Sequence, residues 1–172
     1  MRPTHEPVAR HDQDGVFLGE IQPLQRRCRQ GRAIAICARA QQVEVHFGVD
    51  LLAASPESLT ASVDVIIKGG ASSFIAGLGV PMPIIQQLHE AGLKVMVVCG
   101  AVKHAVKAEQ AGCDAVICQG GEGGGHTGLV GTLPLIAQAV DAVKIPVVGA
   151  GGLYDGRGLA ASLALGAQGV WM

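Results

Sequence analysis

The segment from Gln119 to Gly128 reads Gln-Gly-Gly-Glu-Gly-Gly-Gly-His-Thr-Gly, which is a loop with few side chains and one histidine, His126. Backbone N–H groups in such a loop are open to close approach by an anionic or planar ligand. Imidazole is the side chain best suited to moving a proton near neutral pH. We therefore predict a ligand site in this loop, with His126 as the catalytic candidate.

A second glycine cluster, Gly149-Ala-Gly-Gly152, directly follows the apolar run Ile145–Val148. Asp155 then precedes a helical pattern and is suited to cap it. Backbone N–H groups of a glycine loop next to a helix N-terminus are typical of phosphate sites. The alternative interpretation is an ordinary glycine turn between a strand and a helix.

Three polar residues near these clusters could assist a reaction. Gln119 closes the strand before the first loop and can hydrogen-bond the polar edge of a ring. Glu122 either orients a neighbour or is a solvated loop carboxylate. Lys68 is expected at the end of a strand over Val63–Ile67, pointing to the same edge, or else is a simple surface lysine.

Other reactive side chains have simpler explanations. Cys99 and Cys118 lie near strand ends but have no base beside them in sequence, so we expect them to pack in the core. Surface or structural roles are expected for the histidines His5, His11, His89 and His104.

Apolar runs alternate with amphipathic stretches from about Val43 onward. Strands are predicted over Val43–Leu51, Val63–Ile67, Lys94–Cys99, Asp114–Cys118, Ile145–Val148 and Gln168–Met172. Helices are predicted over Met82–Glu90, Val102–Ala111, Thr132–Ala142 and Gly156–Leu165. Short, β-branched strands that alternate with helices indicate βαβ units and a parallel sheet. Serial repetition of such units favours an α/β fold of the (β/α)8 TIM-barrel type.

The predicted barrel is incomplete. A full barrel has eight strands in about 250 residues, whereas about six strands are found here, and the last stops in mid-pattern at Met172. Residues 1–42 form a divergent segment with apolar periodicity from about Ile21 to Ala40, typical of one helix. Residues 43–172 form the partial barrel domain.

Composition narrows the class of protein. Apolar residues make up 49% and charged residues 16% of the 172 residues, as expected of a globular protein. A net charge of −1 and 3% aromatic residues argue against a nucleic-acid partner. The chain has no apolar run that could span a membrane and no signal peptide. With five cysteines and no Cys-x-x-Cys pair, we expect a cytoplasmic protein without disulfides or metal.

One competing motif is present. Gly123, Gly125 and Gly128 satisfy the dinucleotide-binding pattern G-x-G-x-x-G after a strand. That fold needs an acidic residue near the end of the next strand, and Ile145–Ala150 offers none.

Taken together, several segments resemble the nitronate monooxygenase family, formerly called 2-nitropropane dioxygenases, over about residues 43–172. The matching segments are Phe47-Gly-Val-Asp-Leu-Leu52, Leu88-His-Glu-Ala-Gly-Leu-Lys-Val95, Ala111-Gly-Cys-Asp-Ala-Val116, Gln119–His126, Gly131-Thr-Leu-Pro134, Ile145–Gly152, Asp155-Gly-Arg-Gly158 and Ala164-Leu-Gly-Ala-Gln-Gly-Val170. These enzymes are FMN-dependent barrels. The resemblance implies oxidation of alkyl nitronates or nitroalkanes with O2 to a carbonyl compound and nitrite.

The resemblance also implies roles for individual residues. His126 would be the general base that takes a proton from the carbon next to the nitro group. The ring system of FMN would contact Asp50, where the family often has Asn, and the segment of Gln119, Gly123, Gly124 and Gly125. The FMN phosphate would bind to Gly151 and Gly152. The implied partners are the small substrate and O2, with a homo-oligomer left open.

Two departures from the family keep alternatives open. The family's first two strands are not found in residues 1–42, and its Gly-Thr after the last strand would follow Met172. The chain is therefore either an enzyme or a catalytically inactive barrel fragment. FMN-dependent enoyl-acyl carrier protein reductases have a similar Gly-Gly-His loop, but they usually have Glu at the position of Gln119 and lack Gly131-Thr-Leu-Pro134.

Overall fold

The structure is a computed structural model that describes residues 34–36, 46–53 and 56–172. Its sheet contains β1 (Ile34–Ile36), β2 (Gly48–Leu52), β3 (Ser73–Gly77), β4 (Lys94–Cys99), β5 (Ala115–Gln119), β6 (Val147–Ala150) and β7 (Gly169–Trp171). The helices are α2 (Pro56–Lys68), α3 (Ile85–Glu90), α4 (Val102–Gln110), α5 (Thr132–Ala142) and α6 (Gly156–Ala164).

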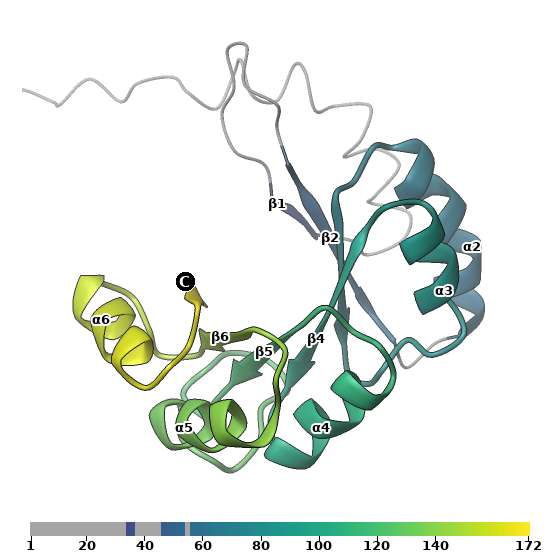
Figure 1. The fold of residues 1–172 in the computed structure, drawn as a ribbon. Coiled ribbons are helices and arrows are strands. Elements are labelled where there is room, and N and C mark those ends of the chain that lie inside the picture. Colours follow the sequence, from purple (N-terminus) through teal and green to yellow (C-terminus); the bar gives the residue numbers. More distant parts are fainter. Residues whose placement is uncertain (1–33, 37–45, 54–55) are drawn as a thin grey trace, which may run out of the picture.

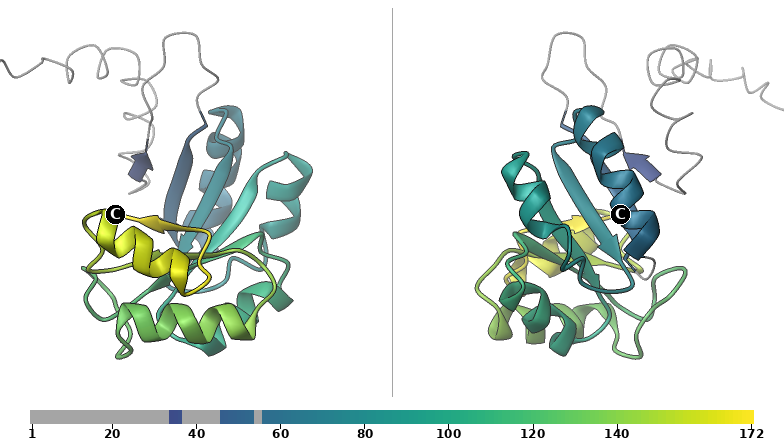
Figure 2. Two further views of the ribbon diagram at one scale, coloured as in Figure 1. Left: turned by 60° about the vertical axis from the view of Figure 1, so that its left-hand side comes forward. Right: turned by 90° about the vertical axis from the view of Figure 1, so that its right-hand side faces the viewer.

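The strands lie in the sheet in chain order, β1 to β7, and all pairs from β2 to β7 are parallel. Figure 1 shows the sheet curving so that the helices lie on its outer side. The side views in Figure 2 show α2 running along the outer side of neighbouring strands. In the described residues β1 pairs only with β2 and β7 only with β6, so the barrel is open. The predicted α/β barrel type, incomplete, is confirmed.

Alternating side chains give the sheet two apolar faces. Along β4, Val95 and Val97 are buried against the helices, together with Phe74 and Leu88. The inner face carries a smaller cluster of Ile75, Ile117 and Ala150, with Met96, Val98, Val148 and Trp171 packed against it. This period of two is what a parallel sheet covered by helices requires. The outer layer is the main core of the described chain.

The strand predicted over Val63–Ile67 is wrong, because these residues belong to α2. Leu59, Val63 and Ile66 are buried at helical spacing, which the run of β-branched residues obscured. The parallel strand in this part of the chain is β3, which the sequence analysis missed. Lys68 therefore ends a helix, exposed to solvent, and not a strand at the site.

Smaller differences concern the ends of elements. Ile34–Ile36 form β1, antiparallel to β2, within the stretch where one helix was predicted. The rest of residues 1–42, including His5 and His11, lies outside the described residues. Strand β6 begins and ends two residues later than predicted. Because it ends at Ala150, Gly149 lies inside the strand, and only Gly151 and Gly152 lie in the following loop.

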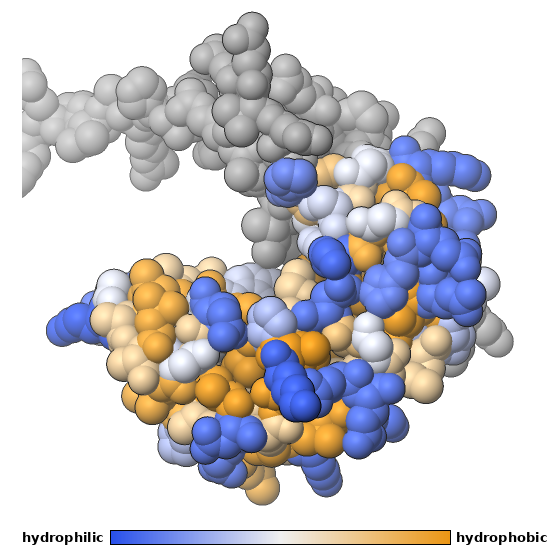
Figure 3. Space-filling model, viewed as in Figure 1, coloured by the Kyte–Doolittle hydropathy of each residue, from blue (hydrophilic) through white to orange (hydrophobic). Residues whose placement is uncertain are grey.

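The outer surface is not uniform. In Figure 3 hydrophilic residues cover α2 and α3, whereas apolar residues gather over α5 and α6. None of the described helices is long and apolar enough to cross a membrane.

Candidate active site

The two glycine clusters lie side by side at the carboxyl end of the sheet. The N–H of Gly120, after β5, donates to the carbonyl oxygen of Ala150 at the end of β6 at 3.0 Å. Carboxyl ends of parallel strands meet at one edge of a sheet, which is where barrel enzymes place their active sites. The structure thus brings together the two clusters that the sequence singled out.

Thr132, the first residue of α5, joins the two clusters. Its N–H donates to Oε2 of Glu122 at 2.8 Å, and its hydroxyl lies 3.0 Å from the same oxygen. The hydroxyl is also 2.6 Å from the carbonyl oxygen of Gly151. The hydroxyl can donate to one acceptor at a time. Glu122 therefore holds the glycine-rich loop on the N-terminus of α5, and it is not a freely solvated carboxylate.

These contacts change the acidity of Glu122. Hydrogen bonds from its own N–H, from the Thr132 N–H and from the Thr132 hydroxyl lower the pKa of the Glu122 carboxyl. The carboxylate accepts hydrogen bonds where the N-terminal N–H groups of α5 also favour negative charge.

Close approach of backbone segments requires glycine at two positions of the loop. A Cβ on Gly120 would collide with the backbone of Thr132, and a Cβ on Gly128 would collide with the carbonyl oxygen of Gly100. Gly128 therefore lets the loop cross directly over the end of β4. Gln119 adds a further contact, because its amide donates to the carbonyl oxygen of Gly124 at 2.8 Å.

Gly151 and Gly152 have φ angles of +94° and +68°, in the left-handed region. Glycine adopts this conformation without steric cost and leaves the backbone of the turn without a covering Cβ. Among the described residues, no acceptor is found for either N–H group. The nearby N-terminus of α6 is already capped, since Asp155 accepts from the N–H groups of Arg157 and Gly158.

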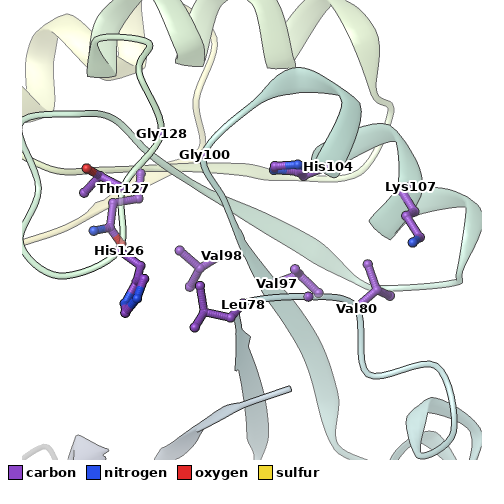
Figure 4. A pocket seen from close by; sticks show the side chains of 12 residues that line it. Leu78, Val80, Val97, Val98, Gly100, His104, Lys107, His126, Thr127 and Gly128 are labelled. Atoms are coloured by element: carbon purple, nitrogen blue, oxygen red, sulfur yellow. The ribbon is translucent and has the colours of Figure 1, made fainter. Parts of the chain in front are cut away.

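His126 lies at one end of a cavity of about 540 Å³. Its imidazole is exposed and has no hydrogen-bond partner in the described part of the chain. Figure 4 shows His126 at one end of the cavity, with Val98 and Leu78 next to it. Either ring nitrogen is thus free to accept a proton from a ligand in the cavity.

The middle of the cavity is apolar. It is lined by Leu78 and Val80 from the loop after β3, by Val98 on the inner face of β4 and by the buried Val97 on the face of β4 toward the helices. Leu78 has a φ of 54°, a left-handed conformation that is unfavourable for a branched side chain. A residue held in this conformation beside a cavity is typical of functional loops.

Asp50 lies on the inner side of the sheet, beside Ile75 in register. Its Oδ1 is buried and has no hydrogen-bond partner among the described residues. Burial raises the pKa of the Asp50 carboxyl. Unpartnered buried acceptors are rare, so this oxygen indicates a place for a donor from a ligand. Asp50 does not line the cavity at His126.

The remaining candidates have structural roles. Cys99 and Cys118 are buried, and burial raises the pKa of Cys99 to about 12 and that of Cys118 to about 11. Both are therefore thiols that pack in the core, as predicted. His89 contacts Oδ2 of Asp114 at 2.8 Å. Asp114 directly precedes β5, at the end of this strand away from the site, so His89 has the predicted structural role.

Sequence reasoning missed three residues at the site. Thr132 was assigned to a helix and to the matching segment Gly131-Thr-Leu-Pro134 but was given no role at the site, because its contacts with Glu122 and Gly151 join separate segments of the chain. His104 was expected to be structural, and Lys107 was not considered, yet both line the cavity from α4. Their spacing of three residues, which places two side chains on one helix face, was the available signal.

A known protein family matches most of this chain. The family model described as nitronate monooxygenase matches residues 23–172. The chain belongs to the nitronate monooxygenase family. The match begins about twenty residues before the resemblance noted from the motifs, so it includes residues 23–42, about half of the predicted N-terminal segment.

Curated relatives have several activities. The chain is 48% identical over 126 residues to (3aS,4S,5R,7aS)-5-hydroxy-7a-methyl-1-oxo-octahydro-1H-indene-4-carboxyl-CoA dehydrogenase of Rhodococcus jostii, covering 73% of this chain and 35% of the relative. It is 42% identical over 123 residues to a probable nitronate monooxygenase of Staphylococcus saprophyticus, covering 64% and 35%. The chain thus spans about a third of the length of these relatives.

Solved structures agree with this assignment. FabK from Thermotoga maritima is 42% identical with a TM-score of 0.70, covering 76% of this chain and 42% of that one. Nitroalkane oxidase from Streptomyces ansochromogenes is 35% identical with a TM-score of 0.63, covering 67% and 37%. Monooxygenase, oxidase and dehydrogenase are all names of oxidoreductases, so relatives in this family share a reaction class but not a substrate.

Proposed function

We propose that this chain carries the site of an FMN-dependent nitronate monooxygenase, which oxidises alkyl nitronates or nitroalkanes with O2 to a carbonyl compound and nitrite. The observation that carries the proposal is the position of His126. It is an unpartnered imidazole on a glycine-rich loop at the carboxyl end of a parallel strand, facing an apolar cavity. A base in this position can reach a carbon acid held in the cavity.

The described residues fit FMN. The free N–H groups of Gly151 and Gly152 suit its phosphate, as expected for the loops after the last barrel strands. The unpartnered Oδ1 of Asp50 suits a donor of its ring system. Gln119 and the loop residues Gly123, Gly124 and Gly125 would form a further wall. The redox chemistry itself belongs to the bound FMN.

The chain's own residues would handle the proton and the negative charge. A ring nitrogen of His126 takes the proton from the carbon next to the nitro group, which leaves negative charge on the nitro oxygens. Backbone N–H groups of the glycine-rich loop would stabilise this charge. Leu78, Val80 and Val98 exclude water from the carbon chain.

A second candidate function is oxidation of a coenzyme A thioester. It is favoured by the identity of 48% to the carboxyl-CoA dehydrogenase of Rhodococcus jostii and 46% to that of Mycobacterium tuberculosis, against 42% to the probable nitronate monooxygenase of Staphylococcus saprophyticus. The carbon next to a thioester carbonyl is acidic, like the carbon next to a nitro group. His126 can therefore serve as the base in both reactions.

Three assays on the FMN-loaded chain separate the candidates. Nitrite release from propionate 3-nitronate is expected for the first, and anaerobic bleaching of the flavin by an acyl-CoA for the second. NADH consumption with a crotonyl thioester would instead indicate an enoyl-thioester reductase. A protein that stays colourless with added FMN would contradict every flavin-dependent function of this chain.

Replacement of His126 tests the role of the base. With a neutral nitroalkane as substrate, we expect His126→Ala to lower kcat of nitrite release by about 10²- to 10⁴-fold, the usual contribution of general base catalysis, whereas a nitronate, which is already deprotonated, should lose less. His46→Gln, which changes an exposed histidine just before β2, serves as the matched control and should keep full activity. Unchanged activity of His126→Ala would refute this assignment.

A further inference from the structure

Two basic side chains of α4 line the same cavity as His126. His104 and Lys107 lie three residues apart on α4 and both line the cavity. Figure 4 shows Lys107 at the far end from His126, with Val97 and Val98 between them. The cavity therefore has an imidazole at one end, an apolar wall in the middle and the ammonium group of Lys107 at the other end.

The charge at this end is uncompensated. No carboxylate lines the cavity in the described part of the chain, and Lys107 makes no ion pair there. Lys94 and Arg157, in contrast, are paired with Asp114 and Asp155. A lysine beside a partly enclosed apolar cavity, with no acidic neighbour, attracts an anionic group of a ligand.

An alkyl nitronate does not use this arrangement, because it carries its negative charge at the reacting end and has no second anionic group for Lys107. Propionate 3-nitronate has a carboxylate as well, but only one methylene group separates it from the reacting carbon, which is too short to pass the apolar wall. A cavity of about 540 Å³ has the size typical of sites for larger ligands. A coenzyme A thioester matches this arrangement part by part. Its acidic carbon would lie beside His126, its extended arm along the apolar wall and a phosphate group at Lys107.

We propose that Lys107, assisted by His104, binds a phosphate group of a coenzyme A thioester whose acyl carbon lies beside His126. This inference rests on the second candidate function above and adds the residues that would determine its specificity. Lysine is a common phosphate ligand that acts as a point charge, and the histidine ring can donate a further hydrogen bond.

The test compares two ligands and two lysines. Acetyl-CoA carries phosphates, whereas S-acetylpantetheine has the same thioester and arm without them. Lys103 is exposed on the same helix but does not line the cavity, so Lys103→Gln is the matched control for Lys107→Gln. Calorimetric titration of the FMN-loaded and FMN-free proteins measures affinity independently of turnover.

We expect the parent protein and Lys103→Gln to bind acetyl-CoA about tenfold more tightly than S-acetylpantetheine, as expected for one charged hydrogen bond. Lys107→Gln should lose this preference and bind S-acetylpantetheine unchanged. The preference should also weaken at high salt, because the site is partly exposed. Equal affinity of the parent protein for both ligands, or equal losses in the two lysine variants, would overturn the proposal.

Bleaching of the flavin by acyl-CoA tests the function separately. Selective binding that depends on Lys107 supports the phosphate site even if no bleaching occurs, and the dehydrogenase function then fails alone. Bleaching with no preference for acetyl-CoA over S-acetylpantetheine supports the function and refutes the phosphate site.

Discussion

At the scale of single residues, position and partners distinguish the histidines and carboxylates of this chain. His89 is fixed by Asp114, whereas His126 has no described partner and lies in a cavity. Burial alone would raise the pKa of Asp114, but hydrogen bonds from Lys94, the Val95 N–H and His89 outweigh it and lower the pKa. Asp114 thus stabilises the fold, and reactive behaviour is expected only of His126.

Glu122 provides a prediction at this scale. Glu122→Ala removes the acceptor for Thr132 and should release the loop that carries His126, so we expect kcat of nitrite release from a neutral nitroalkane to fall about ten- to hundredfold through misplacement of the base. Glu90→Gln, an exposed carboxylate on α3, is the control and should keep its activity. Faster proteolysis of residues 121–131 in Glu122→Ala would show directly that the loop is released.

The lowered pKa of Glu122 sets the direction of the pH effect. A depressed pKa means that the loop contact is fully present above the ordinary glutamate pKa and is lost as the pH falls through the lowered value. Protection of the loop from proteolysis should therefore persist at neutral pH and disappear only in acid. Loss of protection between pH 6 and 8 would contradict this role, since Glu122 does not titrate there.

At the scale of elements, the carboxyl ends of β4, β5 and β6 are held together by glycine contacts. Gly128 crosses over Gly100, and Gly120 packs on the start of α5. Loops that must approach each other this closely have no room for a Cβ. The glycine-rich loop is thus a packed structure along part of its length and an open surface only around Gly124 and Gly125.

The stability of glycine variants tests whether the loop is packed at Gly128 and open at Gly124. Gly128→Ala should lower the free energy of unfolding by about 1–3 kcal/mol, because the added methyl group forces the backbone of Gly100 to move. Gly124→Ala is the matched control, since a Cβ there meets nothing within 4 Å. Chemical denaturation of both variants measures the difference, and equal stabilities would show that the crossing does not constrain the fold.

At the scale of the whole molecule, the described strands form an open, barrel-like sheet with a well-packed outer core and a smaller inner cluster. Helices cover the outer face, so the side chains of that face are buried between the sheet and the helices. Trp171 on β7 is only partly buried at the inner cluster, beside Ala150 in register. It therefore lies next to the loop of Gly151 and Gly152.

The single tryptophan provides a signal for cofactor binding. If FMN binds at Gly151 and Gly152, we expect titration with FMN to quench the fluorescence of Trp171. Gly152→Val should weaken this binding at least about tenfold, because a side chain there meets the Cβ of Glu122 and the φ of +68° disfavours a branched residue. Trp171→Phe should abolish the signal, and titration of free N-acetyltryptophanamide with FMN corrects for absorption by the flavin. Quenching at the same FMN concentration in Gly152→Val would place the cofactor elsewhere.

Local sequence patterns determine many of the helices, the strands and the site loops of this protein. Helix α5 coincides with its prediction, and β4 and α4 agree within one residue, because their period and glycine ends are decided by neighbouring residues. The glycine clusters and His126 stood out for the same reason, since their unusual composition needs no distant partner to be recognised. The parallel barrel type followed from the alternation of strands and helices.

Tertiary structure decided the rest. The run at 63–67 has strand propensity, yet Leu59, Val63 and Ile66 lie on a helix because burial against the sheet outweighs intrinsic preference. Sequence order cannot show that Glu122 is held by Thr132, that Lys107 and His126 share one cavity, or that Asp50 has an unpartnered oxygen. These contacts join residues from different strands and helices, and only the packing of the sheet brings them within reach.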